Sequence, residues 1–183
     1  MVRIATLLIA VLLALPASAT EAGWALLREG GHVVMLRHAY AQGTTEPSDF
    51  DIADCRKQRG LSDRGRQQAR KIGSLFSARA APADAVLTSR LCRAQETARL
   101  AFRDGDVELV ETLDPVPSDT AAAAEQAAAI LALVEGHTGS GNLVLVTDLT
   151  VIQAVTGAGA REGEAVIVRR DGDRLHVLAR IVF

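Results

Sequence analysis

The chain has few aromatic residues, few cysteines and little net charge, and each shortage removes a class of function. Aromatic side chains make up 3% of the 183 residues, which leaves few platforms on which nucleic-acid bases could stack. The formal net charge is −2 and becomes one unit more negative without Arg3, so the composition indicates no basic surface for nucleic acid or anionic lipid. We therefore expect no nucleic-acid partner, and any specificity for anions must arise locally.

Long apolar runs are also scarce, and the one clear example stands at the N-terminus. After Arg3, residues 4–15 are almost wholly apolar, and Ala17-Ser18-Ala19 has the small-x-small form of a cleavage site. An uncleaved membrane anchor is the alternative, but the run is shorter than the roughly 20 residues that a transmembrane helix needs. We therefore predict a signal peptide over residues 1–19, then a periplasmic or secreted domain of residues 20–183 with no stable membrane insertion after cleavage.

The two cysteines, Cys55 and Cys92, are interpreted in the light of that export. An even number of cysteines in an oxidising compartment favours a disulfide. Two alternatives stay open from the sequence: two buried free thiols, or a two-ligand metal site, which is too sparse for structural zinc. We predict a disulfide and no metal site.

The pattern of apolar residues after residue 20 predicts an α/β fold. Short β-branched runs alternate with helix-like segments, which is the order typical of a sheet covered by helices. Strands are predicted at 32–37, 85–88, 107–110 and 142–146, with a closing hairpin at 164–169 and 174–182. Helices are predicted at 21–29, 64–78, 91–102 and 120–134, and in a segment that ends at 155. The expected architecture is a three-layer sandwich with a mostly parallel central sheet, helices on both faces and a C-terminal hairpin.

Polar side chains follow three of the predicted strands. They are Arg37-His38, Ser89 with Arg93 about one helical turn further on, and Thr147-Asp148. Ligands of open α/β sheets bind at the carboxyl ends of the strands, so these side chains are candidates for one site. Arginine offers a planar fork to phosphate oxygens, and a neutral histidine can attack phosphorus. A surface ion pair of Arg93 with Glu96 or Asp84 is the alternative for that residue.

Four ordered segments carry a resemblance to a known family. They are LRHA at 36–39, LSDRGRQQA at 61–69, LTSRLCRAQETA at 87–98 and LVLVTDLTVIQAVTG at 143–157. In this order and context they resemble the histidine phosphatase superfamily, which has the phosphoglycerate-mutase-like fold. With its export signal and two cysteines, the chain is most similar to the small secreted branch of that superfamily.

The resemblance implies roles for the matching residues. It makes His38 the nucleophile that takes the phosphoryl group and makes Arg37 and Arg93 ligands of the phosphate, and it implies no cofactor. Ser89 either contacts the phosphate or caps the helix that begins at Leu91, and the cap is the simpler interpretation. The second segment supplies structural residues only: Ser62 as a helix cap, Gly65 for close packing and Gln68 on the helix surface.

Asp148 departs from the resemblance, because the superfamily ordinarily has a second histidine there whose positive form completes the phosphate pocket. Two unit charges about 4 Å apart interact by roughly 4 kcal/mol at an effective dielectric of 20, so an ionised Asp148 would oppose phosphate binding. Either Asp148 stays protonated and donates a hydrogen bond or a proton, or it turns toward Arg90 or Arg93. The remaining histidines are interpreted as surface or structural residues: His32, His137 and His176.

The acid that protonates the leaving group is a separate question. Members of the superfamily often use an acidic residue after the third strand, where this chain offers Glu111, Asp114 and Asp119. Asp114, in the Pro-rich loop, is the preferred candidate, although all three also suit ordinary solvated charges.

The expected function is therefore an exported phosphomonoester hydrolase that works through a phosphohistidine at His38. Its substrate would be a phosphorylated small molecule or a phosphorylated component of the envelope. Asp148 motivates the alternative, a catalytically weak or inactive family member that binds a phosphate-bearing ligand or an envelope partner. A purely structural envelope protein with an incidental Arg-His pair is the third interpretation, which the ordered segments disfavour.

Overall fold

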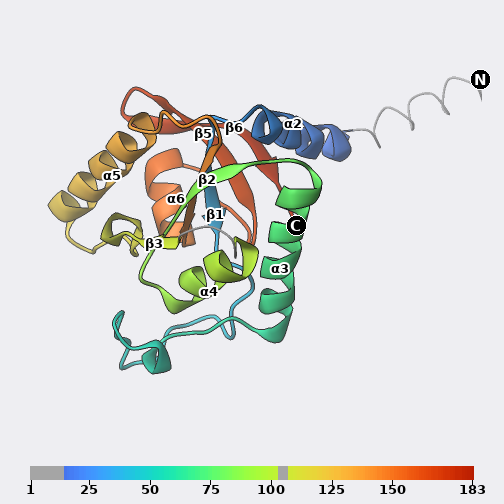
Figure 1. The fold of residues 1–183 in the computed structure, drawn as a ribbon. Helices are drawn as coiled ribbons and strands as arrows, with labels where there is room; N and C mark the ends of the chain where they lie inside the picture. The colour runs from blue at the N-terminus through green and yellow to red at the C-terminus, as the bar shows by residue number, and fades with distance from the viewer. Residues whose placement is uncertain (1–14, 103–106) are drawn as a thin grey trace, which may run out of the picture.

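The computed structural model describes residues 15–102 and 107–183 (Figure 1). Most of the predicted signal peptide, residues 1–14, lies outside the described residues. Within the described ranges, no helix combines the length and the hydropathy that crossing a membrane requires.

The elements follow the predicted alternation of strands and helices. The strands are β1 (Val33–Arg37), β2 (Ala83–Thr88), β3 (Val107–Leu109), β4 (Asn142–Thr147), β5 (Ala165–Asp171) and β6 (Arg174–Ile181). The α-helices are α2 (Leu15–Glu29), α3 (Asp63–Ala78), α4 (Cys92–Ala101), α5 (Thr120–Glu135) and α6 (Leu149–Thr156). Two short 3₁₀ turns, η1 (Cys55–Lys57) and η2 (Glu111–Leu113), lie in the connecting loops.

The strands form one six-stranded sheet in the order β3-β2-β4-β1-β5-β6. Strands β3, β2, β4 and β1 pair in parallel, whereas β5 is antiparallel to β1 and β6 is antiparallel to β5. The β5–β6 hairpin turns at Gly172, whose φ of 63° lies in the left-handed region that glycine adopts without strain. The predicted mostly parallel sheet with a C-terminal hairpin is confirmed.

Helices cover both faces of this sheet (Figure 1). Helices α2, α3 and α4 pack on one face, where Trp24 and Leu36 belong to the same buried cluster. Helices α5 and α6 pack on the other face, where Ile130 and Met35 belong to a second cluster. Leu36 and Met35 are neighbours on β1 and point to opposite layers, as the pleat of a strand requires. The predicted three-layer sandwich is confirmed.

Helix α2 begins at Leu15, upstream of the predicted start at residue 21. Trp24 is 2% exposed, and its ring packs edge-on against Phe76 and Phe183, with centroid distances of 5.6 and 5.8 Å. Such aromatic pairs contribute about 0.5–1.5 kcal/mol each beyond the area they bury. The part of α2 after Ala19 therefore holds the helix against the sheet.

Helix α3 packs closely against the segment that follows β1. Its predicted cap is present, because Ser62 Oγ accepts a hydrogen bond from the Gly65 amide at 3.0 Å. A Cβ on Gly65 would overlap the Tyr40 carbonyl, so this contact requires glycine. The prediction that Gln68 lies on the helix surface is wrong: Gln68 is buried, accepts from the Tyr40 amide at 3.1 Å and donates to the Glu162 carbonyl at 3.0 Å. The amide side chain holds together two loops that meet beside the end of β1.

Candidate active site

The three polar clusters that follow β1, β2 and β4 meet at one edge of the sheet. Strand β4 lies between β1 and β2, so the carboxyl ends of all three are neighbours. The His38 amide donates to the Thr147 carbonyl at 3.0 Å, and the Ser89 amide donates to the Val146 carbonyl at 3.1 Å. The parallel ladder thus continues just past the strands and fixes the backbone of both His38 and Ser89.

His38 is buried, with 1% of its surface exposed, and its imidazole has a defined tautomer. Nδ1 lies 2.8 Å from the Ala39 carbonyl oxygen. Because a carbonyl oxygen only accepts hydrogen bonds, Nδ1 carries the proton of the neutral ring. The lone pair of the neutral imidazole is then on Nε2, the atom left to act as a nucleophile or base.

The surroundings of His38 keep the imidazole uncharged. Burial, the largest cause, and the neighbouring Arg93 lower the pKa of His38 to about 3. Arg37 and Arg59 act in the same direction, while the hydrogen bond to Ala39 opposes them. At neutral pH the ring is therefore in the form that can attack an electrophile.

Arg37 ends β1 beside His38 and is half-buried. Its Nη1 donates to the Ala160 carbonyl at 2.7 Å, which fixes the guanidinium, while its buried Nε has no hydrogen-bond partner among the described residues. Burial lowers the pKa of Arg37, and the charges of Glu162 and Asp148 oppose that shift. The group remains a cation because arginine does not lose its proton in proteins.

Arg93 lies in the first turn of α4 and is 5% exposed. Its Nη1 donates to Glu46 Oε1 at 2.7 Å, so the alternative of a surface pair with Glu96 or Asp84 is wrong. Burial is the largest cause that lowers the pKa of Arg93, and Glu46 acts in the opposite direction. The buried Arg93 Nε has no hydrogen-bond partner among the described residues.

Ser89 follows β2 and is completely buried. The interpretation of Ser89 as a helix cap is wrong, because Leu91 occupies the cap position of α4 and no side chain bonds to that helix end. The Ser89 hydroxyl has no hydrogen-bond partner within residues 15–102 and 107–183. An unpartnered buried hydroxyl is uncommon in folded proteins and favours the alternative role, contact with a ligand.

Glu46 and Arg59 complete the site, and reasoning from the sequence missed both. Arg59 Nε lies 3.4 Å from Glu46 Oε1, the oxygen that also accepts from Arg93. The Arg59 amide donates to Glu46 Oε2 at 3.0 Å, and Arg59 Nη1 donates to the Gly43 carbonyl at 2.6 Å. Both residues stand in the irregular loop between β1 and α3, where no periodic pattern marks a buried position.

The loop that carries these two residues is fastened to α4. Cys55 and Cys92 form a disulfide with a Cα–Cα distance of 5.6 Å, as the cysteine count predicts. Beside it, the Cys92 amide donates to Gln58 Oε1 at 2.9 Å, and Gln58 Nε2 donates to the Ile52 carbonyl at 2.9 Å. Since Arg93 directly follows Cys92, the bridge ties the loop to the helix that positions Arg93.

Asp148 lies at the same edge, where it caps a helix and does not turn toward Arg90 or Arg93. Its Oδ1 accepts hydrogen bonds from Thr150 Oγ1 at 2.8 Å and from the Val151 amide at 3.2 Å, so Asp148 is the N-cap of α6. Both contacts use the carboxylate as an acceptor. No ion pair joins it to Arg90 or Arg93 in the part of the chain that the structure describes.

Asp114 is buried and held by Arg90. One of its oxygens accepts from the Arg90 amide at 2.7 Å and the other from Arg90 Nε at 2.6 Å. The pair fixes the turn that follows Ser89, so the main role of Asp114 in this structure is to hold that turn. Among the described residues, no group of three or more His, Cys, Asp or Glu side chains is placed to hold a metal ion.

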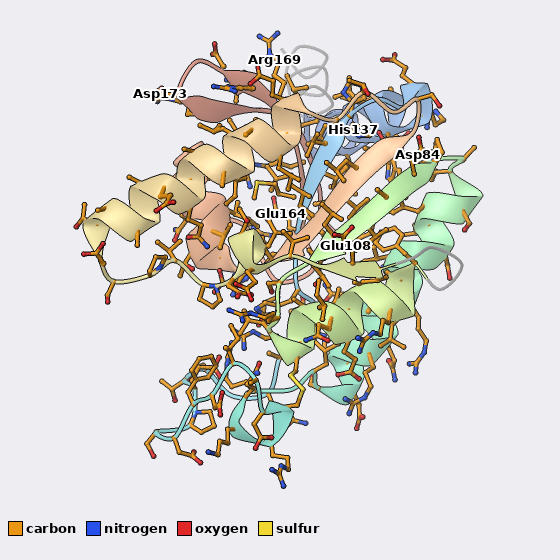
Figure 2. The ribbon with its side chains drawn as sticks, turned by 60° about the vertical axis from the view of Figure 1, so that its left-hand side comes forward. Asp84, Glu108, His137, Glu164, Arg169 and Asp173 are labelled. Atoms are coloured by element: carbon orange, nitrogen blue, oxygen red, sulfur yellow. A yellow bond between two sulfur atoms is a disulfide. The ribbon has the colours of Figure 1, made fainter. Side chains whose placement is uncertain are left out.

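His137 lies away from this edge. Figure 2 shows His137 at the end of the sheet opposite the Cys55–Cys92 disulfide. His137 Nε2 is 2.9 Å from the carbonyl of Gly141, which directly precedes β4. His137 therefore does not stand in for a second histidine beside His38.

Fold and site together define a three-layer α/β protein in which one edge of the sheet holds a buried neutral histidine, the buried Arg93 and the half-buried Arg37. A sequence profile of the histidine phosphatase superfamily (branch 1) matches residues 33–116, which run from β1 through β2 and α4. A 2,3-bisphosphoglycerate-dependent phosphoglycerate mutase of Parvibaculum lavamentivorans is 32% identical over 82 residues. That match covers 43% of this chain and 37% of the relative.

Solved structures share the fold at low sequence identity. A phosphoserine phosphatase of Entamoeba histolytica in complex with 3-phosphoglyceric acid has a TM-score of 0.63 at 14% identity, over 83% of this chain and 97% of that one. The α-ribazole phosphatase of Shigella flexneri has a TM-score of 0.61 at 16% identity, over 81% of this chain and 95% of that one. A phosphoglycerate mutase of Thermus thermophilus has a TM-score of 0.58 at 22% identity, over 83% of this chain and 99% of that one. Residues 33–116 are thus similar to the histidine phosphatase superfamily, and the solved structures share the fold of the chain.

Proposed function

We propose that the protein is an exported phosphomonoester hydrolase that works through a phosphohistidine at His38. The observation that carries this proposal is a set of three buried polar atoms without partners among the described residues: Arg37 Nε, Arg93 Nε and Ser89 Oγ. A phosphoryl group supplies several acceptor oxygens at once, which is what two guanidinium donors and a hydroxyl require. The lone pair of His38 Nε2 is available at the same edge of the sheet.

The reaction then proceeds in two displacements. In the first, His38 Nε2 attacks phosphorus, the bond to the leaving oxygen breaks, and Arg37 and Arg93 balance the charge on the phosphoryl oxygens. The Nδ1 hydrogen bond to Ala39 holds the ring and stabilises the positive charge that develops on it. In the second, water attacks phosphorus and returns His38 to its neutral form. Every step uses residues of this chain.

A phosphorylated small molecule or a phosphorylated envelope component is the substrate class that we propose. The names of the similar proteins refer to phosphoserine, α-ribazole phosphate chemistry and phosphoglycerate, all small phosphorylated compounds. The predicted signal peptide supports a periplasmic or secreted location, and the disulfide suits an oxidising compartment. These two features support our assignment of the chain to the secreted branch of the superfamily.

The competing proposal is a weak or inactive family member that binds a phosphate-bearing ligand. Asp148 favours it, because its charge acts on both Arg37 and Arg93 without pairing directly with either. A carboxylate at that position lowers the positive potential on which a phosphate dianion depends.

The direct test is hydrolysis of an aryl phosphate by protein recovered after export, whose mass should show a chain that begins at Thr20. The wild type is compared with His38→Ala, Asp148→His and Asp148→Asn. Asp148→Asn is the sharper variant, because asparagine caps a helix as well as aspartate does while it removes the charge. We expect activity in the wild type, none in His38→Ala, and roughly tenfold higher activity in Asp148→Asn.

The outcomes separate the two proposals. Equal residual hydrolysis in the wild type and His38→Ala would reject the phosphohistidine enzyme. Activity that emerges only in the Asp148 variants would identify a pocket in which Asp148 has suppressed turnover. A mature chain that still contains residues 1–19 would reject cleavage after Ala19.

A further inference from the structure

Glu46 places a carboxylate between two arginines of the site. Its Oε1 accepts from Arg93 Nη1 at 2.7 Å and lies 3.4 Å from Arg59 Nε, while its Oε2 accepts from the Arg59 amide at 3.0 Å. One carboxylate oxygen thus joins a guanidinium from α4 to a guanidinium from the loop after β1. The Glu46 side chain is 29% exposed, so protons from solvent can reach it.

The acids after the third strand are all engaged elsewhere. Asp114 accepts from Arg90 with both oxygens, and Glu111 accepts from Arg90 Nη1 at 2.9 Å. Asp119 accepts from the Ala122 amide at 2.8 Å and caps α5. Glu46 differs from these three because its carboxylate contacts Arg93, whose buried Nε has no hydrogen-bond partner among the described residues.

A phosphoryl group bound at Arg93 would add negative charge beside Glu46. The charged groups in contact with Glu46 are Arg59 on its own loop and Arg93 on α4, and Asp148 acts on Arg93 from the end of β4. When a phosphate dianion binds Arg93, Glu46 faces a like charge on the same cation. In the proposed reaction this like charge favours the protonated carboxyl, in opposition to Arg59 and Arg93, which favour the carboxylate.

We propose that Glu46 is the acid that protonates the leaving group, an inference that rests on the proposed function. As the bond between phosphorus and His38 Nε2 forms, the bond from phosphorus to the leaving oxygen breaks, and the Glu46 proton passes to that oxygen. In the second step a water oxygen attacks phosphorus, its proton passes to the Glu46 carboxylate, and the bond to His38 breaks. The products are the alcohol and inorganic phosphate, with His38 neutral and Glu46 protonated again.

The test compares two substrates that differ in their need for an acid. The leaving group of 4-nitrophenyl phosphate departs as a stable anion, whereas that of glycerol phosphate requires a proton. Glu46→Gln keeps the shape and an acceptor oxygen for the arginines but cannot donate a carboxyl proton. We expect kcat on glycerol phosphate to fall by about 10²–10³-fold and kcat on 4-nitrophenyl phosphate to fall by less than about tenfold.

Two further variants keep this test decisive. Glu46→Asp retains a carboxyl group and should recover part of the loss on glycerol phosphate, which a merely structural role would not predict. Glu162→Gln is the matched control, because Glu162 is another glutamate near the site and accepts from the Ala41 amide at 3.3 Å. It should change both substrates by the same factor. Equal losses on both substrates in Glu46→Gln, or a gain on both, would overturn the assignment.

A binding measurement separates this proposal from the proposed function. Titration of inorganic phosphate by calorimetry, in buffers of different ionisation enthalpy, counts the protons taken up. We expect the wild type to take up close to one proton more than Glu46→Gln. No difference would overturn the role of Glu46. No turnover together with an intact difference would instead reject the proposed function and leave Glu46 as the proton acceptor of an anion-binding site.

Discussion

At the scale of single residues, burial influences the charge states of the side chains in the site. His38 is buried next to arginines, so the imidazole stays neutral, with a pKa of about 3. Arg37 and Arg93 are also desolvated, yet they keep their charge and hold unpartnered donors. In the proposed reaction, His38 is the neutral nucleophile and the two arginines are the cations that receive the phosphate dianion. The same burial makes these residues costly for folding.

Replacing His38 by glutamine should reduce the loss of stability in acid. As the pH falls below about 6.5, the unfolded chain binds a proton at residue 38 that the folded protein refuses until about pH 3. The free energy of unfolding is therefore highest above the pKa of the unfolded chain, about 6.5. It falls as the pH drops toward the pKa of the folded protein, about 3. At about 1.4 kcal/mol per pH unit, the wild type should lose roughly 2–3 kcal/mol more than His38→Gln between about pH 7 and pH 4.5.

Urea unfolding of both proteins across that pH range measures the effect. The wild-type and His38→Gln free energies should diverge steadily below about pH 6.5. Curves that stay parallel down to about pH 4.5 would mean that His38 binds protons in the folded protein nearly as it does in the unfolded chain.

At the scale of elements, the irregular loop from the end of β1 to α3 is what completes the site. It carries Glu46 and Arg59, and it is fastened to α4 by the Cys55–Cys92 disulfide and by Gln58. A loop of this length has little regular structure of its own, so the bridge restricts it in both the folded and the unfolded protein. The loop and α4 therefore act as one unit in positioning the arginines.

Replacing both cysteines by serine should weaken stability and anion binding together. The bridge spans 37 residues of sequence, for which the chain-entropy relation gives about 4 kcal/mol of stabilisation. Urea unfolding should show that loss, and phosphate affinity in the folded variant should fall about tenfold, because Arg59 and Glu46 lose their fixed position beside Arg93. The reduced wild type is the control and should behave like the double variant. An unchanged unfolding midpoint would contradict this role of the bridge.

At the scale of the whole molecule, the sequence predicts the fold well and the site in part. The apolar runs of β1 and β4 are buried on both faces, and their alternation with amphipathic helices is enough to predict a three-layer sandwich. Arg37, His38 and Arg93 are found because they follow strands or open a helix. These predictions rest on local periodicity, which a single sequence contains.

The rest of the site depends on contacts between distant segments. Glu46 and Arg59 meet Arg93 only through the course of an irregular loop, and composition does not specify that course. The helical pattern predicts Gln68 on the surface of α3, but Gln68 is buried because two loops cross beside it. Asp148 stands where a histidine is expected, although it also supplies the cap of α6. Tertiary contacts thus decide the roles of Glu46, Arg59 and Gln68, whereas Asp148 acts through local contacts with Thr150 and Val151.

The measurement that tests the central claim most directly is capture of the phosphoryl group on His38. Exported wild-type protein is mixed with excess 4-nitrophenyl phosphate and quenched rapidly in alkali, in which phosphohistidine survives, and its peptides are analysed by mass. We predict one phosphoryl group on the peptide that contains His38 in the wild type, and none in His38→Ala. Continued turnover with no phosphorylated peptide, or with the phosphoryl group on another residue, would contradict the phosphohistidine mechanism.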